Sequence, residues 1–532
     1  MKFLMIYAND TANTKVPIGI LYILTRLKKE GHEVSMFDSS KYAIDIDKND
    51  YAIRGRFLNF QAVDLRPYGV TFESVTMEQL DQKLKEHILN FCPDLIGISI
   101  LEDTSKTGLH FAEICKKVAP KVPLIVGGVY CLTRPEYVIE NKFVDIVCVG
   151  EGEESISELM FNLSKGKSFE AISNLWIKLP DGDIKKNAIG YPTELDSLPY
   201  IDLSIIEDRH LFAPFAGHAY KTSFVEGQRG CPRRCTYCCN QIFLDAYSKF
   251  GAKYLRRKTV NRLIQEIVYL KDNFGLNFIQ FIDDDFLFSP LDRIKEFSES
   301  YKKHVNLPFW IQAEACNVTE EKIKLIRKAG CISISIGIET GSKYILEKIM
   351  KRKTSQEITL KAFKIMHRHG IRTSANVILG MPEETRENIF ETIEFVRKCK
   401  PVSINSNIFV PYYGTALREY CVEKGYLDKD YHRGSRNSWK AVLNMPQISQ
   451  DEVENLSRVF VLYATLSKKY WAQIGMVEKF PEKSLELQRK LENIFWKIVC
   501  KRGINIDVRG YDYSLFFKNR QLELQSQGKN KV

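Results

Sequence analysis

The chain of 532 residues lacks any apolar run long enough to cross a membrane. Its longest apolar stretches, such as VFVLYATL at 459–466, fall far short of the roughly 20 residues that a transmembrane helix needs. The N-terminal stretch MKFLMIYAND turns polar after seven residues, so we expect no signal peptide. We therefore predict a cytoplasmic protein without a membrane span, in a compartment that keeps thiols reduced.

The composition lacks the bias of a disordered or fibrous chain. Hydrophobic residues make up 44% and charged residues 27%, which is ordinary for a folded globular protein, and the length predicts two or three domains. Thirteen cysteines in a reducing compartment indicate buried thiols and a metal site rather than disulfides. The formal net charge is +11, partly from residues 483–532. A solvated basic tail and a contact with an anionic partner both stay open there.

The first 165 residues alternate short apolar runs with amphipathic segments, which is typical of a doubly wound, Rossmann-like parallel sheet. No G-x-G-x-x-G follows the first apolar run, so dinucleotide binding loses its main support. Ligands of such sheets bind at the carboxyl ends of the strands. The predicted strands are 2–7, 33–37, 95–100, 123–128 and 145–150, and the predicted helices lie near 17–30, 76–91, 105–118 and 153–164.

The alternation stops and then returns further along the chain. Residues 166–218 are rich in Pro, Gly and Asp and are interpreted as a linker, whereas 219–415 contain six further β/α units. Six units exceed a βαβ pair and fall short of eight, which predicts a partial (β/α)6 barrel. Residues 416–532 are predicted to form a helical C-terminal cap.

One stretch, RGCPRRCTYCCN at 229–240, holds the only cluster of cysteines. Cys231, Cys235 and Cys238 form C-x3-C-x2-C directly after the first predicted barrel strand. Thiolates select zinc or iron–sulfur clusters, and structural zinc needs four ligands. Cys239 adjoins Cys238 and is a poor fourth ligand, and no His follows within sixty residues. Three thiolates would leave one iron of a four-iron cluster open; core cysteines or an incomplete zinc site remain the alternatives.

This stretch resembles the cluster loop of the radical S-adenosylmethionine (radical SAM) superfamily. The resemblance implies that Cys231, Cys235 and Cys238 hold a [4Fe–4S] cluster whose fourth iron binds the amine and carboxylate of S-adenosylmethionine. It also implies that Tyr237 lies against the adenine. Cys239 has no role in the family, and we expect it to be a packing residue.

Two later strand segments resemble the same family. In SIGIETGS, the resemblance implies that Glu339 contacts the ribose or methionine part of S-adenosylmethionine. In NVILGMPEE, it implies that Ile378 lies against adenine, followed by Gly380 and Glu383. Asn376 replaces the first glycine of this family pattern.

Acidic residues end two other predicted barrel strands. Asp283, Asp284 and Asp285 are consecutive, and because like charges repel, at least one should face solvent or cap the next helix. Gln312 and Glu314 end the third strand, and the sequence leaves open whether they face the cavity or the wall.

Placed before such a barrel, the N-terminal region resembles the cobalamin-binding domain of the cobalamin-dependent radical SAM enzymes. The similar segments are VPIGILYILTRLKKEGHEVSMFD, PDLIGISIL, PLIVGGVYCLTRPE and DIVCVGEGEES. The resemblance implies that an S-x-L pair and the glycines receive the dimethylbenzimidazole tail of cobalamin. The residues carried over are Ser99, Leu101, Gly127, Gly128, Gly150 and Glu151.

One family pattern, D-x-H-x-x-G with its cobalt-ligating His, is missing. Ending that pattern at Gly19 puts Thr14 at the Asp position and Val16 at the His position, and no His precedes His32. We therefore expect base-off cobalamin without a histidine ligand.

The resemblance implies a methyltransferase acting on an unactivated carbon or phosphorus centre, through a 5′-deoxyadenosyl radical and methylcobalamin. An oxidative cyclase or rearrangement enzyme of the porphyrin-cyclase type is the alternative. A metal-stabilised nucleic-acid-binding protein is a remote one, and scattered N-terminal cysteines argue against tRNA methylthiolation. The expected partners are a small-molecule or peptide substrate and an electron donor such as flavodoxin or ferredoxin, with nucleic acid unfavoured.

Overall fold

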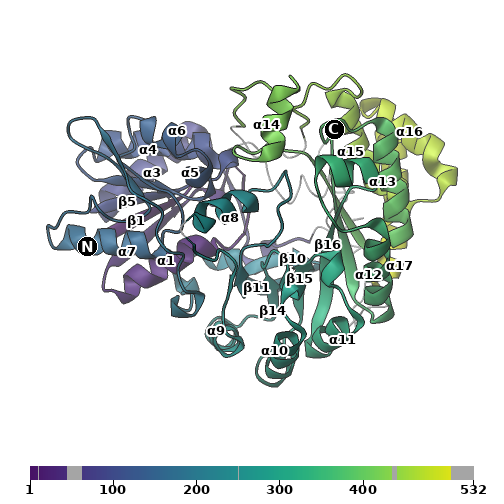
Figure 1. The fold of residues 1–532 in the computed structure, drawn as a ribbon, viewed down its shortest axis with the longest axis horizontal. Coiled ribbons are helices and arrows are strands. Elements are labelled where there is room, and N and C mark those ends of the chain that lie inside the picture. The colour runs from purple at the N-terminus through teal and green to yellow at the C-terminus, as the bar shows by residue number, and fades with distance from the viewer. Residues whose placement is uncertain (10, 45–62, 250, 434–439, 505–532) are drawn as a thin grey trace.

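Two α/β units lie side by side in the computed structural model, with a helical C-terminal region beyond the second (Figure 1). The structure describes residues 1–9, 11–44, 63–249, 251–433 and 440–504. Expectations that fall on the chain after residue 504 lie outside the described residues. In the part of the chain that is described, no helix is both long and apolar enough to span a bilayer.

The N-terminal sheet has the strand order β2-β1-β5-β6-β7-β8-β9 and is parallel from β2 to β7. Alternate strand residues face opposite helix layers: Leu4 and Ile6 pack toward α3 and α4, and Phe3 and Met5 toward α1 and α7. Burial on both faces explains why these strands are continuous apolar runs. The elements are β1 (Lys2–Tyr7), α1 (Ile18–Lys29), β2 (Glu33–Asp38), α3 (Met77–Phe91), β5 (Leu95–Ser99), α4 (Ser105–Val118), β6 (Leu124–Gly127), α5 (Val129–Thr133), α6 (Pro135–Glu140), β7 (Ile146–Cys148) and α7 (Glu153–Ser164).

The segment 166–218, expected to be a linker, instead contributes strands to both sheets. β8 (Leu175–Lys178) and β9 (Ile184–Lys186) continue the first sheet antiparallel to β7, and β10 (Phe212–Phe215) pairs antiparallel with the second. A tight turn joins β8 to β9, with Gly182 at φ +93°. The Pro, Gly and Asp residues that suggested a linker therefore form turns between short strands.

The second sheet has the order β10-β11-β14-β15-β16-β17-β18, parallel from β11 onward, and forms the predicted partial barrel. Helices on its outer side connect successive strands (Figure 1). The strands are β11 (His218–Val225), β14 (Phe278–Phe281), β15 (Phe309–Ala313), β16 (Cys331–Glu339), β17 (Arg372–Leu379) and β18 (Ser403–Ile408). These outer helices are α9 (Val260–Phe274), α10 (Leu291–His304), α11 (Glu320–Ala329), α12 (Gln356–Arg368) and α13 (Arg386–Cys399), whereas α8 (Asn240–Ser248) lies between the two units.

The C-terminal region is helical, as predicted, and covers the edge strand β18. It comprises α14 (Ala416–Glu423), α15 (Gln450–Thr465), α16 (Trp471–Lys479) and α17 (Leu485–Ile504). Ser449 caps α15 by accepting a hydrogen bond from the Glu452 amide at 3.2 Å. Trp471 packs edge-on against Phe390 and Tyr463 in the shared core.

The carboxyl ends of the two sheets face one another, with α8 between the two units in Figure 1. A buried polar cluster joins α1 to α9 below this edge. The Lys258 ammonium donates to the Tyr22 hydroxyl at 2.8 Å and pairs with the Glu266 carboxylate. Lys258 and Glu266 are both fully buried, so removing either partner would leave an uncompensated charge.

The carboxyl edge of the first sheet carries two adjacent glycines, Gly127 and Gly128, with different amounts of space around them. Gly128 has φ +105°, and a Cβ there would lie 2.3 Å from the Ile100 carbonyl oxygen. At Gly127 a Cβ would meet only the Cys148 Cβ, at an ordinary 3.6 Å. We predict that Gly128→Ala lowers the free energy of unfolding by about 2–4 kcal/mol, while Gly127→Ala changes it by less than about 1 kcal/mol. Thermal unfolding followed by circular dichroism measures both; equal Tm values for the two variants would contradict the described backbone.

Candidate cofactor sites between the two sheets

A cavity of about 340 Å³ lies at the carboxyl edge of the first sheet. Most sequence-predicted residues of the N-terminal unit line it, together with residues of α1 and of the barrel. Leu101 does not: it precedes a short 3-10 turn and is 48% exposed. The predicted residues in the lining are Ser99, Gly127, Gly128, Gly150 and Glu151.

Glycines make this edge accessible because the backbone itself forms the cavity wall. A Cβ at Gly97 would lie 2.6 Å from the Phe3 ring, and one at Gly150, where φ is +122°, would lie 3.1 Å from the Tyr247 hydroxyl. Gly19 faces open space, since a Cβ there would meet no atom within 4 Å. A glycine-rich, mostly apolar recess at strand ends suits a flat, uncharged ring system.

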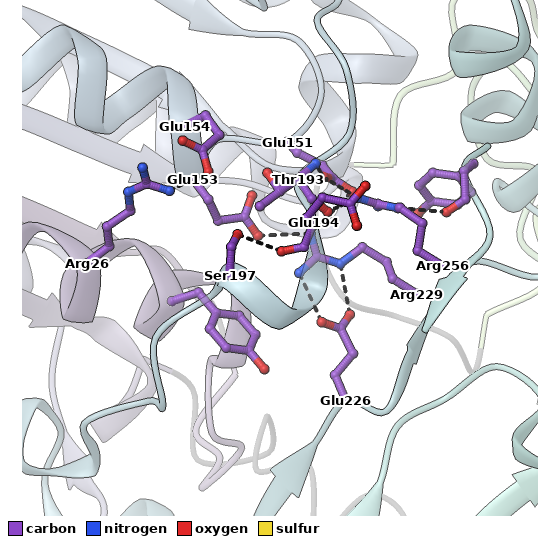
Figure 2. A network of polar contacts seen from close by, with 12 residues as sticks. Arg26, Glu151, Glu153, Glu154, Thr193, Glu194, Ser197, Glu226, Arg229 and Arg256 are labelled. Atoms are coloured by element: carbon purple, nitrogen blue, oxygen red, sulfur yellow. Dashed lines mark hydrogen bonds and ion pairs between the residues drawn. The ribbon is translucent and has the colours of Figure 1, made fainter. Parts of the chain in front are cut away.

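A buried ion-pair network joins this cavity to the loop that carries the cysteines (Figure 2). Arg229 and Arg256 are directly opposed in the β12–β13 ribbon (Gln228–Arg229 with Arg256–Arg257), so their charges would repel without counter-ions. Glu151 pairs with both guanidinium groups. Arg229 also pairs with Glu153 and Glu226, each at 2.9 Å.

Glu151 belongs to the first unit and both arginines belong to the second, so the network fixes the two units together. Burial alone would raise the pKa of Glu151, but Arg229 and Arg256 hold it below its ordinary value. The Thr193 amide donates to the same carboxylate at 2.8 Å. The sequence resemblance singled out Glu151 for a ligand, whereas the structure commits its carboxylate to this interface.

Cys231, Cys235 and Cys238 lie on one loop between β12 and α8, and none forms a disulfide. Each side chain is partly buried, and burial raises the pKa of Cys231 to about 12 and also raises that of Cys235. Cys239 occupies the N-cap position of α8, with its thiol hydrogen-bonded to that of Cys238. Among the described residues, no three His, Cys, Asp or Glu side chains are close enough to hold a single metal ion. Three thiols without a fourth protein ligand remain a donor set that fits an iron–sulfur cluster.

Arg352 joins the cluster loop to the ends of two barrel strands. Its guanidinium pairs with Glu314 after β15, donates to Glu339 at 2.8 Å, and lies 3.3 Å from the Tyr237 hydroxyl. Desolvation raises the pKa of Glu339 even with Arg352 beside it, whereas the pKa of Glu314 is lowered because Arg352 and Thr354 outweigh its burial. The side chain of Glu314 therefore faces Arg352, on the same side as Glu339.

Sequence reasoning missed Arg352. The only sequence signal was the basic run KRK at 351–353, which follows the SIGIETGS segment. The structure shows that Arg352 in its middle is buried, whereas Lys351 and Lys353 are exposed.

Tyr237 and Ile378 both pack against the same apolar cluster, which includes Met350 and Met381. Gly380 has φ +72°, and its amide donates to Glu384 at 2.6 Å, with the Met381 amide at 3.2 Å from the same oxygen. The buried carboxylate at this turn is thus Glu384. Glu383, which the family pattern singled out, accepts hydrogen bonds from the hydroxyl groups of Tyr344 and Tyr420.

The three consecutive acids separate as expected. Asp283 is buried and accepts from the Gly227 amide at 2.7 Å, and Asp285 is buried and accepts from the Glu314 amide at 3.1 Å. Asp284 is exposed and pairs with the Asn240 side chain at 3.1 Å. Burial raises the pKa of Asp283 to about 7 and that of Asp285 to about 6.

The barrel interior holds a second cavity of about 340 Å³. Gln312 lines it, and a ladder of amides and hydroxyls crosses its neighbouring strands: Asn405 donates to Asn376 at 2.9 Å, and Asn376 donates to Ser335 at 3.0 Å. Asn376, the departure from the family's glycine, thus belongs to this polar ladder. Trp496 of α17 lies in the wall, so it contributes to a cavity as well as to the core.

Comparison with protein families agrees with this arrangement. Residues 225–396 match the radical SAM superfamily, and residues 57–160 match the B12 binding domain. The first match begins at the end of β11 and runs through most of α13, and the second ends within α7. The chain is therefore a radical SAM superfamily enzyme, and within that superfamily it belongs to the members that carry a cobalamin-binding domain.

Curated relatives include both methyltransferases and cyclases. An uncharacterized methyltransferase of Pyrococcus horikoshii is 28% identical over 67% of this chain and 74% of the relative. The cytidylyl-2-hydroxyethylphosphonate methyltransferase of Streptomyces wedmorensis is 22% identical over 86% of this chain and 87% of the relative. The anaerobic magnesium-protoporphyrin IX monomethyl ester cyclase of Rubrivivax gelatinosus is 23% identical over 64% of this chain and 60% of the relative.

Two solved structures share the fold. The cobalamin-dependent S-adenosylmethionine radical enzyme OxsB superimposes with a TM-score of 0.64 at 16% identity, covering 99% of this chain and 75% of that one. The radical S-adenosylmethionine methyltransferase TsrM from Kitasatospora setae gives a TM-score of 0.58 at 14% identity, covering 93% and 99%. Both likenesses extend over both sheets and into the helical region.

The interface network yields a prediction with a control three residues away in the chain. Glu151→Ala leaves two buried guanidinium groups short of a counter-ion and should lower the free energy of unfolding by about 3–5 kcal/mol. Glu154→Ala removes an ion pair to Arg26 whose carboxylate is half-exposed, and should cost less than about 1 kcal/mol. Differential scanning calorimetry of both variants measures this. Similar Tm values would mean that the network does not hold the units together.

Proposed function

We propose that this protein is a cobalamin-dependent radical SAM methyltransferase that acts on an unactivated carbon or phosphorus centre. The observation that carries the proposal is Arg229. It lines the glycine-walled cavity of the first sheet, pairs with two carboxylates of the B12-binding unit, and precedes Cys231 by two residues. The cavity and the cysteine loop thus share one wall, which supports two cofactors in one reaction space.

In this proposal Cys231, Cys235 and Cys238 hold the [4Fe–4S] cluster. Bound there, the cluster supplies the electron for reductive cleavage of S-adenosylmethionine. The resemblance places Tyr237 and Ile378 beside the adenine, and their common apolar cluster supports this.

Two further groups complete the proposed binding site for S-adenosylmethionine. Glu339 offers a buried carboxylate toward the ribose or methionine part, and Arg352 fixes its orientation. Gly380, held in a left-handed turn by Glu384, offers backbone at close approach.

Cobalamin binds, in this proposal, with its tail in the first cavity, against Ser99, Gly127, Gly128 and Gly150, beside the Glu151 network. Leu101 is left out because its half-exposed side chain does not line the cavity. We propose a base-off form without a histidine ligand. The support comes from Thr14 and Val16: the Thr14 hydroxyl donates to the Phe212 carbonyl at 3.0 Å, and Val16 is buried in the apolar core.

The polar barrel interior supports a small or peptide substrate rich in hydrogen-bonding groups. The likeness to a phosphonate methyltransferase over most of both chains favours methyl transfer. The cyclase relatives make oxidative cyclisation the competing outcome. The proposal places the protein in a reducing cytoplasm with a flavodoxin or ferredoxin as reductant, because the cluster needs reduced thiols and an external electron.

Cys239 provides a control within the same loop for a substitution of a proposed cluster ligand. After anaerobic reconstitution, Cys235→Ala should lose most of the iron and sulfide and abolish formation of 5′-deoxyadenosine, because one cluster corner has no ligand. Cys239→Ala should retain both, since Cys239, although its thiol bonds to that of Cys238, is not one of the three proposed ligands. Iron and sulfide analysis with liquid chromatography of the nucleoside gives the result. Zinc in place of iron, or equal losses in both variants, would overturn the cluster assignment.

The reaction type is decided by the products. Methyl transfer should yield S-adenosylhomocysteine and 5′-deoxyadenosine in equal amounts, and the product should gain one methyl group. A cyclase would yield 5′-deoxyadenosine without S-adenosylhomocysteine. Mass spectrometry of the reduced, cobalamin-loaded enzyme with each candidate substrate separates the two, and absence of S-adenosylhomocysteine contradicts the methyltransferase proposal.

A further inference from the structure

The segment KYILEKIMKRK at 343–353 is a basic stretch that contacts the cysteine loop. It contains five Lys or Arg residues and one acid, Glu347. Its four lysines are exposed, and we call their surface the lysine face: Lys343, Lys348, Lys351 and Lys353.

The inner side of this segment holds the cysteine loop in place. The Thr236 amide donates to the Met350 carbonyl at 3.3 Å, and its hydroxyl donates to the Ile349 carbonyl at 2.7 Å. Thr236 lies between Cys235 and Cys238. The lysine face is therefore separated from the cysteine loop by one layer of backbone.

Residues 351–354 alternate between the two sides of this layer. Arg352 and Thr354 are buried and bind Glu314, whereas Lys351 and Lys353 point away from it and are exposed. Lys351 has φ +53°, a conformation that non-glycine residues adopt rarely. The backbone thus forms a strained turn. The inward guanidinium of Arg352 is paired with a carboxylate, whereas, among the described residues, the outward ammonium groups of Lys351 and Lys353 are not.

Ion pairs leave most of the lysine face without a counter-charge. Lys343 pairs only at 4.0 Å with Glu347, and in the described part of the chain Lys348, Lys351 and Lys353 have no carboxylate partner. Exposed Arg234, on the cysteine loop itself, pairs with Asp245 at 2.6 Å. Such a cluster of like charges on a rigid support steers acidic partners and suits a transient complex.

We propose that the lysine face is the docking site for an acidic one-electron carrier, a flavodoxin or ferredoxin. The proposal rests on the proposed function, because only a cluster on this loop needs an electron. A reduced carrier docked there would give one electron to a [4Fe–4S] cluster held by Cys231, Cys235 and Cys238, and would leave oxidised by one electron. The cluster would pass that electron to the sulfonium of S-adenosylmethionine, whose carbon–sulfur bond would break to give methionine and the 5′-deoxyadenosyl radical. The complex is small and salt-sensitive, as electron-transfer interfaces are.

The test compares two triple variants of the full-length protein with the same change in charge. Lys348→Glu/Lys351→Glu/Lys353→Glu alters the lysine face, and Lys324→Glu/Lys361→Glu/Lys364→Glu alters exposed lysines on α11 and α12. Binding of a flavodoxin and of a ferredoxin is measured by biolayer interferometry at low salt and at about 0.3 M salt, where charges are screened beyond a few ångströms. Circular dichroism and iron content confirm that both variants fold and carry the cluster.

We expect the lysine-face variant to bind the carrier at least about tenfold more weakly than wild type and to lose most of the salt dependence. The α11–α12 variant should bind like wild type. Cluster reduction followed by electron paramagnetic resonance should be slowed in the lysine-face variant with the carrier and unchanged with dithionite. Binding of neither carrier by wild type, or equal weakening in both variants, would overturn the docking site.

The dithionite measurement separates this inference from the proposed function. If dithionite reduces no cluster and yields no 5′-deoxyadenosine in wild type, the radical SAM function fails. If dithionite supports cleavage while the lysine-face variant binds and accepts electrons from the carrier like wild type, only the docking site fails.

Discussion

The ion pairs of Glu151 with Arg229 and Arg256 are the constraint on which the reaction space depends. Two arginines lie opposite one another on a short ribbon, and carboxylates from the other unit neutralise them. Because the groups are largely buried, their pairing depends on geometry, and the observed placement of the two units satisfies both arginines. A reaction that moves a group between two cofactors needs such fixed placement, because radicals react with whatever is nearest.

A second charge balance operates inside the barrel. Arg352 compensates Glu314 and Glu339 at the ends of neighbouring strands and reaches Tyr237 on the cysteine loop. The ends of β15 and β16 are therefore tied to the cysteine loop through Arg352. Lys351 and Lys353, on either side of Arg352, are exposed on the outer surface of the same turn. The residues of the proposed binding site, the cysteine loop and the proposed docking surface thus meet at one short segment of backbone, 349–354.

Local patterns predicted most of the fold. Continuous apolar runs marked strands buried on both faces, and each of the five strands expected in the first sheet lies within a few residues of its predicted position. The segment 166–218 was different because strands of three or four residues look like turns in sequence; pairing with β7 and β11 makes them strands. Glu383 and Glu384 show the same limit. Adjacent acids are equivalent in a motif, and the direction of the turn at Gly380 decides which one is buried.

The sequence by itself determined the chemistry: three cysteines at fixed spacing, an aromatic residue beside the third, and glycines at the ends of parallel strands. These follow from local covalent spacing, which survives in the unfolded chain. Only the tertiary structure decided that Glu151 binds two arginines, that Leu101 does not line the cavity and that Arg352 joins three segments. It also decided that Lys348, Lys351 and Lys353 are exposed on the segment whose carbonyl groups bind Thr236 of the cysteine loop. Those are contacts between residues far apart in the chain, and charge and burial at such contacts arise only once the sheets have packed.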